Sequence, residues 1–289
     1  MYYILYNPIS GNGKGGEEID RIKELISGEC KVLSVLDIES YASLISSLSE
    51  DDVIVLSGGD GTVNRFANGI ADIELKNPVY YYPAGSGNDF IHDVDGAELG
   101  KLTLINQYVT NLPTVEVNGE THRFVNGVGY GIDGYCCEVG DKLRLESDKP
   151  INYTSIAIKG LLFHYKPTNA TVTVDGVTKT YKKVWIAPTM NGRLYGGGMI
   201  ATPEQSRTNP EHTLSLMIFH GTGRLRTLMI FPSIFKGEHV KKKNAVEVLV
   251  GKEITVKFDK PTPLQIDGET VLGVTEYTAR SAALVPEKV

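Results

Sequence analysis

The chain has 289 residues, of which 41% are hydrophobic and 22% charged, and its formal net charge is −6. This balance is typical of a folded globular protein and excludes general disorder, and the negative charge provides no basic field for binding nucleic acid. The three cysteines form neither a disulfide framework nor a CxxC zinc pattern, and the first residues lack the features of a signal peptide. We therefore expect a cytoplasmic protein with no nucleic-acid partner.

The first third of the chain alternates between strand-like and helix-like segments. Apolar runs at 2–6, 30–36, 53–56 and 79–82 predict strands, and the segments 19–26, 41–48 and 63–70 between them predict helices. The run 53–56 shows no polar alternation, which is typical of a strand covered on both faces. This order predicts a Rossmann-like α/β domain over residues 1–115.

After about residue 112 the pattern becomes mostly β. Asn118-Gly119 and Asp175-Gly176, pairs that favour tight hairpin turns, lie between strand-like segments. The segments 246–250 and 254–258 are spaced like sandwich strands, and 152–163 predicts one helical insert. We expect a β-sandwich domain over residues 116–289.

Three glycine-rich segments, 7–16, 57–62 and 83–89, each follow a predicted strand. At the carboxyl ends of adjacent parallel strands they would converge on one crevice, where backbone N–H groups can reach phosphate oxygens. The plain alternative is three tight turns in which glycine permits a positive φ. The first loop also fits GxGxxG at Gly11, Gly13 and Gly16, with Asp37 near the end of the next strand, so a dinucleotide is an alternative ligand for that loop.

The segment 58–64, Gly-Gly-Asp-Gly-Thr-Val-Asn, followed by Asn68-Gly69, resembles the signature of the diacylglycerol kinase catalytic domain family. The chain is also similar to this family, in the same order, at Asn7-Pro8 with Ser10-Gly11 and at 85–89, 195–199 and 267–269. The resemblance covers nearly the whole chain. It implies a transferase that binds ATP and Mg²⁺ in a cleft between an α/β domain and a β-sandwich, and phosphorylates diacylglycerol or a related lipid alcohol.

The resemblance also implies an ATP site in the first domain. Asp60 would act on Mg²⁺ through a water network, because a bare carboxylate facing phosphates would repel them. Asn88-Asp89 has the alternative role of capping a following helix. The implied nucleotide-binding residues are Asn7, Ser10, Gly58, Gly59, Asp60, Gly61, Thr62, Ser86, Asn88 and Asp89.

Phosphoryl transfer to a hydroxyl requires positioning, charge neutralisation and a carboxylate that receives the proton. If 263–269 is one strand, Asp267 and Glu269 point to one face and can share a site. Spacing alone favours an Asp-Gly hairpin turn with a solvated Glu269. The resemblance assigns the catalytic base to this acidic pair without deciding between its members.

Two departures from the family pattern bear on the activity. Arg65 stands where the family usually has Glu, and Glu211-His212 replaces an Asp-Gly loop that carries a structural Mg²⁺ in many bacterial members. Glu211 is therefore the corresponding metal-ligand position with altered chemistry. An NAD kinase-like enzyme and a non-catalytic nucleotide- or lipid-binding protein on the same scaffold are the alternative functions.

The segment 224–243 combines basic and apolar residues, with Lys241-Lys242-Lys243 near its end. Such a segment suits peripheral contact with an anionic membrane, where each cation contributes about 1 kcal/mol. The alternative is a core helix with a solvated basic end. No pattern in the sequence indicates the oligomeric state.

Overall fold

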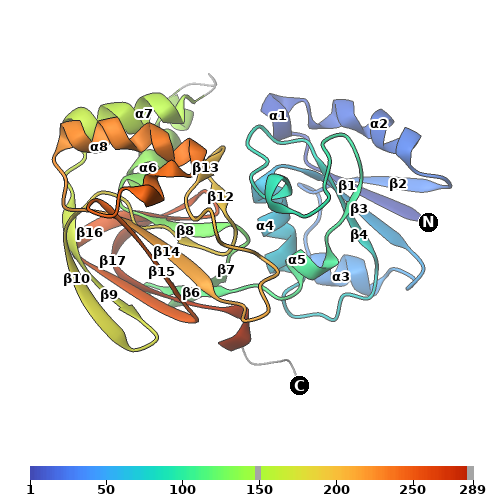
Figure 1. Cartoon of the computed structure of the whole chain (residues 1–289). Coiled ribbons are helices and arrows are strands. Elements are labelled where there is room, and N and C mark those ends of the chain that lie inside the picture. Colours follow the sequence, from blue (N-terminus) through green and yellow to red (C-terminus); the bar gives the residue numbers. More distant parts are fainter. Residues whose placement is uncertain (147–150, 285–289) are drawn as a thin grey trace. The chain divides into compact units, whose positions relative to one another are not determined.

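The computed structural model describes residues 1–146 and 151–284, and the chain divides into two compact units, Met1–Leu112 and Pro113–Val289. Each unit has its own main β-sheet (Figure 1). Among the described helices, none is both long and apolar enough to cross a bilayer.

Unit 1 is an α/β domain with a five-stranded sheet in the order β2-β1-β3-β4-β5. The first four strands are parallel and β5 is antiparallel to β4. The elements are β1 (Tyr2–Tyr6), α1 (Ser10–Gly13), η1 (Gly15–Glu17), α2 (Glu18–Leu25), β2 (Cys30–Ser34), α3 (Tyr41–Ser46), β3 (Val53–Gly58), α4 (Asp60–Gly69), β4 (Val79–Pro83), η2 (Ile91–Asp93), β5 (Thr103–Leu104) and α5 (Asn106–Val109).

The predicted pattern of burial in unit 1 is confirmed. Ile54, Val55 and Leu56 of the central strand β3 are fully buried, as expected for a strand covered on both faces. The α4 stripe that begins at Val63 and includes Phe66 is also buried, but the helix begins at Asp60, inside the second glycine segment and three residues before the predicted start.

Unit 2 is built on an antiparallel sheet, with helices packed over part of it (Figure 1). The main strand path is β15-β14-β11-β8-β16-β17-β6-β7, and β9 joins it through β16. The elements are β6 (Thr114–Val117), β7 (Glu120–Arg123), β8 (Gly127–Tyr130), α6 (Ile132–Glu146), α7 (Tyr153–Lys159), η3 (Gly160–His164), β9 (Thr168–Val174), β10 (Val177–Val184), β11 (Thr189–Met190), β12 (Leu194–Tyr195), β13 (Met199–Ile200), β14 (Leu214–Phe219), α8 (Arg224–Ile230), η4 (Phe231–Lys236), η5 (Glu238–Lys241), β15 (Val246–Gly251), β16 (Glu253–Ile266), β17 (Glu269–Arg280) and η6 (Ala282–Leu284).

The long strand β16 links the parts of unit 2. Its first half pairs with β9 and its last residues pair with β8, and the register with β17 shifts between Lys257 and Thr262. Tyr130 of β8 stacks on Phe258 of β16 with ring centroids 3.8 Å apart. The two halves of β16 thereby enclose one apolar core.

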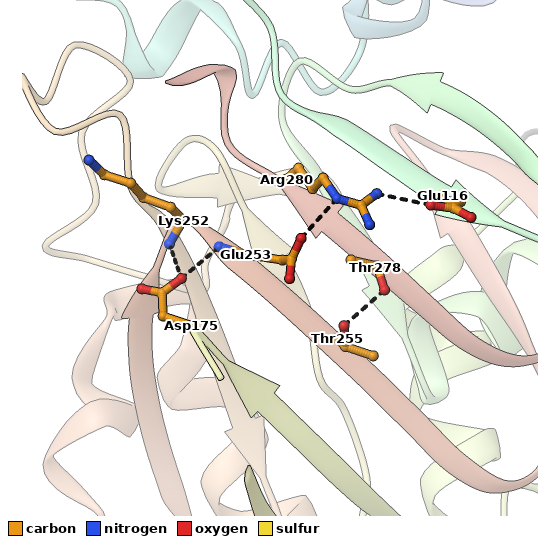
Figure 2. A network of polar contacts seen from close by, with 7 residues as sticks. All are labelled: Glu116, Asp175, Lys252, Glu253, Thr255, Thr278 and Arg280. Carbon is orange, nitrogen blue, oxygen red and sulfur yellow. Dashed lines mark hydrogen bonds and ion pairs between the residues drawn. The ribbon is translucent and has the colours of Figure 1, made fainter. Parts of the chain in front are cut away.

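Polar contacts join hairpins of unit 2 that are far apart in sequence (Figure 2). The Asp175 carboxylate accepts hydrogen bonds from the backbone N–H groups of Lys252 and Glu253 at 2.9 and 2.8 Å. Arg280 of β17 pairs with Glu253 on one side and Glu116 of β6 on the other, each at 2.9 Å. These contacts tie the β9–β10 turn and strand β6 to β16 and β17.

The predicted hairpin turns of unit 2 are confirmed, but its longest helix, α6, was not predicted. Asn118 and Asp175 adopt φ of 52° and 47°, each followed by a glycine with positive φ. Residues 152–163 form α7 and most of η3, as expected. The 15-residue helix α6 was not predicted, because its buried residues form no apolar stripe at helical spacing: they are Ile132, Asp133, Gly134, Cys136 and Gly140.

Candidate active site

The three glycine loops of unit 1 follow β1, β3 and β4, which are neighbours in the sheet. The structure therefore confirms that the three loops converge at the carboxyl ends of neighbouring parallel strands. Hydrogen bonds join the loop starts: Asn7 N–H donates to Ser57 O at 2.9 Å, and Ala84 N–H donates to Gly58 O at 2.8 Å. The Tyr81 hydroxyl, fully buried below, also donates to Gly58 O. Burial, with the nearby Asp60 charge, raises the pKa of Tyr81.

The first two loops are also joined by side chains. Asn7 Nδ2 donates to Thr62 Oγ1 at 2.9 Å, and Asn7 Oδ1 accepts from Ile9 N–H. Thr62 is buried, and a Cβ on Gly58 would lie 2.3 Å from its hydroxyl oxygen. Gly58 is thus required by contact between β3 and α4, and Thr62 has a place in loop packing that the sequence did not reveal.

The second and third loops touch through glycine backbone. A Cβ on Gly85 would lie 2.5 Å from the Gly59 Cα, which excludes a side chain there without movement of backbone. Asn88, at φ 54°, accepts from Gly85 N–H and donates to Gly85 O. By contrast, a Cβ on Gly61 would meet no atom within 4 Å. Packing of the two loops therefore requires glycine at positions 59 and 85, whereas position 61 has room for a Cβ.

Asp60 holds the second and third loops together. Its two carboxylate oxygens accept the backbone N–H groups of Phe90 at 2.7 Å and Asp89 at 3.1 Å. Asp60 is also the first residue of α4, where the helix dipole favours a negative charge. This contact fixes the carboxylate orientation relative to the glycine loops.

The remaining predicted nucleotide residues differ in exposure. Ser10 begins α1 and is half-buried, and Ser86 is exposed at the tip of the third loop. Asp89 is buried. The alternative capping role of Asn88-Asp89 is not observed, since Phe90 is the N-cap of η2 and no side chain caps it.

In unit 2 the residues 263–269 do not form one strand, and the alternative that spacing alone favours, an Asp-Gly hairpin turn with a solvated Glu269, is confirmed. Strand β16 ends at Ile266 and β17 begins at Glu269, so Asp267 and Gly268 form the turn between them. Their φ values of 46° and 97° match those of the other Asp-Gly and Asn-Gly turns. The side chains at 267 and 269 therefore do not share a face through strand alternation, and their roles stay a prediction.

The Asp267 carboxylate is anchored to backbone of the segment 125–127. It accepts hydrogen bonds from three successive N–H groups, those of Val125, Asn126 at 2.8 Å and Gly127 at 2.9 Å. From the other side Arg207 donates to Val125 O and to Asn126 Oδ1. Neither Arg207 nor Asn126 was predicted, because these contacts join residues about 80 and 140 positions apart and no local pattern marks them.

Glu269 differs from Asp267 in its surroundings. It is exposed at the first position of β17, opposite Ile266. The neighbouring Thr270 hydroxyl donates to Asp141 of α6 at 2.6 Å and ties the start of β17 to that helix. The acidic pair therefore consists of one anchored and one solvated carboxylate.

A buried carboxylate that the sequence did not suggest lies near this turn. Asp133 at the start of α6 is 7% exposed and accepts a hydrogen bond from the Tyr195 hydroxyl at 2.7 Å. A Cβ on Gly129, which pairs with Gln265 in β16, would meet both Gln265 and Asp133. Burial raises the pKa of Asp133 to about 7, and the Tyr195 hydrogen bond opposes that shift.

This buried acid predicts a specific pH dependence of stability. The pKa of Asp133 is about 7 in the folded state and near 3.8 in the unfolded chain, so the folded state holds the proton more tightly. The stabilisation that this tighter proton binding gives the folded state is complete below the unfolded pKa and is lost as pH rises through 7. We expect the free energy of unfolding to fall by about 1.4 kcal/mol from this group between pH 6 and 8. Urea unfolding followed by the fluorescence of Trp185 should show this fall, and Asp133→Asn should remove it. Equal pH dependence in both proteins would contradict the assignment.

The structure lends no support to a metal site at Glu211. Its side chain is 77% exposed and pairs with Lys252 at 3.3 Å. In residues 1–146 and 151–284 there is no group of three or more His, Cys, Asp or Glu side chains that could hold a metal ion.

Both units of the chain match models of known protein families. The model of the diacylglycerol kinase catalytic domain matches residues 1–115, and that of the YegS C-terminal NAD kinase beta sandwich-like domain matches residues 126–288. The chain belongs to the family defined by the YegS C-terminal NAD kinase beta sandwich-like domain, and its first 115 residues match the diacylglycerol kinase catalytic domain. Its relatives include a Bacillus subtilis (strain 168) protein named "Putative lipid kinase YtlR", 25% identical over 97% of this chain and 96% of the relative. A Staphylococcus aureus (strain JH9) protein with a name of the same form, SaurJH9_0749, is 26% identical over 93% of this chain and 90% of the relative.

A solved structure shows the same fold. The crystal structure of a "putative diacylglycerol kinase" from Bacillus anthracis str. Sterne superposes with a TM-score of 0.66 at 18% identity, covering 97% of this chain and 92% of that one. The two family matches confirm the resemblance expected from the sequence. The α/β unit followed by an antiparallel β unit confirms the expected fold class. The cleft between the two domains stays a prediction.

Proposed function

We propose that this protein is a lipid kinase that transfers the γ-phosphoryl group of ATP to the hydroxyl of diacylglycerol or a related lipid alcohol. Family membership supports kinase chemistry, and the names of the relatives support a lipid acceptor. The observation that carries the proposal is the interlocked set of three glycine loops, with Asp60 fixed by two backbone N–H groups at the sheet edge. Such an edge suits a nucleotide phosphate chain.

Magnesium fits this site as an ion brought by the nucleotide. Mg²⁺ retains several waters and uses one or two carboxylates together with substrate phosphates, so a closed protein cage is not needed. Asp60 offers oriented carboxylate oxygens, and no cluster of three metal-binding side chains occurs in the described residues. When bound, Mg²⁺ would neutralise charge on the transferring phosphoryl group.

The acidic pair Asp267 and Glu269 remains our candidate for the proton acceptor. Asp267 is held in one orientation by three N–H groups, while Glu269 is exposed and can reorient. A general base must lie within hydrogen-bond reach of the acceptor hydroxyl. Asp267 has the advantage of a fixed orientation, and Glu269 has the advantage of a carboxylate oxygen that is accessible to a substrate.

A single assay tests the proposed function. Labelled ATP with Mg²⁺ is incubated with a panel of long-chain lipid alcohols, including diacylglycerol, and separately with NAD. We expect chloroform-extractable label from the lipid panel. Label on NAD would instead support the NAD kinase-like alternative, and nucleotide binding with no labelled product would support a non-catalytic protein on this scaffold.

A prediction at Gly61 separates nucleotide contact from folding. The site has room for a methyl group, and Gly61 lies inside α4, so Gly61→Ala should keep or raise stability by about 0.5–1 kcal/mol. If phosphate approaches the start of α4 closely, the same methyl should weaken ATP binding by about tenfold or more. Calorimetric titration with a non-hydrolysable ATP analogue measures this effect. Gly223→Ala, at another glycine with open surroundings, is the matched control and should leave binding unchanged.

A further inference from the structure

Helix α8 has an unusual outward surface for a helix packed on a core. Thr227 and Ile230 are buried, and the opposite side carries Leu225 at 73% exposure and Met229 at 74%. Leu225 and Met229 are four residues apart and so lie on one face of the helix. A solvated helix normally places polar residues there. The core contact expected for this segment is thus present, together with an apolar surface that no described part of the chain covers.

The segment α7–η3 extends this apolar surface. Arg224 of α8 donates to Leu161 O of η3 at 2.7 Å, and η3 contacts both α7 and α8 in unit 2 (Figure 1). Ile158 is 41% exposed and Phe163 is 70% exposed, whereas Ile156 of α7 is buried in the core. We call the surface formed by Ile158, Phe163, Leu225 and Met229 the α7–α8 face.

The two segments that carry the α7–α8 face contain basic residues and no acidic ones, whereas the acidic residues Glu138 and Asp141 of the neighbouring helix α6 pair with cations of that helix. The segments 151–174 and 213–237 contain no Asp or Glu, in a chain that has 35 of them among 289 residues. They carry exposed cations at Lys159, Lys166, Arg226 and Lys236. Exposed apolar side chains between cations match a surface with an apolar interior and anionic headgroups.

We infer that the α7–α8 face docks on an anionic phospholipid bilayer, with Phe163, Leu225 and Met229 entering the headgroup region and the flanking cations contacting lipid phosphates. This inference rests on the proposed function only in that a lipid kinase must reach its acceptor in a membrane. It differs from the expectation based on sequence alone, since the exposed apolar residues come from α7, η3 and α8, whereas Lys241-Lys242-Lys243 lie beyond them at the end of η5.

Vesicle sedimentation without ATP tests the inference. The full chain should bind vesicles of phosphatidylcholine with phosphatidylglycerol more tightly than vesicles of phosphatidylcholine alone, and salt should weaken the difference. The double variant Leu225→Ser/Met229→Ser should bind roughly tenfold or more weakly, because two exposed apolar side chains are lost from the interface. Its matched control is Leu99→Ser/Val177→Ser, two residues of 59% and 74% exposure elsewhere on the chain, which should bind as the natural protein does.

A charge variant tests the electrostatic part independently. Arg226→Glu changes two charges at the surface, and since each is worth about fivefold in binding, we expect about 25-fold weaker binding to the anionic vesicles. Lys31→Glu, at an exposed position on β2, is the control and should have a much smaller effect. Circular dichroism checks that each variant is folded.

Three outcomes would overturn the inference: no binding of the natural protein to anionic vesicles, unchanged binding of both α7–α8 variants, or a dimer that these variants convert to a monomer without vesicle binding. Activity on a short-chain diacylglycerol dissolved as monomers separates this result from the proposed function. Product with no sedimentation would reject the docking face alone, whereas sedimentation with no product on any acceptor would reject the kinase proposal alone.

Discussion

Asp60→Asn is expected to lower kcat/KM by about a hundredfold or more while leaving the protein folded. The substitution keeps one oxygen but places an NH₂ group against a backbone N–H, so either Asp89 or Phe90 loses its acceptor. Third-loop positions would shift, and displacements of about 1 Å near a reacting phosphate can cost about a hundredfold. Removal of the charge would also weaken any water-mediated contact with Mg²⁺.

The measurement combines steady-state kinetics with urea unfolding followed by circular dichroism. We expect a loss of about 2 kcal/mol in the free energy of unfolding, from one charge-assisted hydrogen bond and one unpaired N–H group. Asp51→Asn, at an exposed position just before β3, is the matched control and should change neither quantity appreciably. Natural activity in Asp60→Asn would remove Asp60 from the proposed site.

The glycine loops show what the sequence can predict. Short apolar strands followed by glycine-rich segments were enough to place residues 7–16, 57–62 and 83–89 at neighbouring strand ends, because parallel topology forces that arrangement. The sequence did not separate glycines that pack from those that leave space. Gly85 packs against Gly59, whereas a Cβ at Gly61 would contact no other atom. This difference depends on how closely two loops approach each other in three dimensions.

Unit 2 shows where prediction from the sequence fails. The Asp-Gly signal correctly predicts the turns at 175–176 and 267–268, because it depends on two adjacent residues. Contacts between distant side chains are not predicted in this way. The contacts of Asp133 with Tyr195 and of Arg207 with Asn126 join residues 62 and 81 positions apart. No period or motif encodes such pairs, which exist only because antiparallel strands bring distant segments together.

Asp267→Asn is expected to reduce both stability and activity, because its carboxylate serves three N–H groups at once. Oδ1 accepts from Asn126 and Gly127, and Oδ2 accepts from Val125. The side-chain amide of asparagine has only one acceptor atom, so at least one of the three backbone N–H groups would face the NH₂ group of the amide and lose its hydrogen bond. We expect a loss of about 3 kcal/mol in the free energy of unfolding, the upper range for a hydrogen bond to a charged group. Urea unfolding followed by Trp185 fluorescence reports on unit 2 directly.

Glu269→Gln is the matched variant, since an exposed carboxylate without such anchoring should leave unfolding nearly unchanged. Activity then distinguishes the roles. If Glu269 receives the proton, Glu269→Gln loses about a hundredfold or more in kcat at unchanged stability. If Asp267 receives it, the activity of Asp267→Asn stays low even at low temperature and without denaturant, where the variant is folded. Full activity in both variants would remove the acidic pair from catalysis, because a carboxamide cannot act as the base at neutral pH.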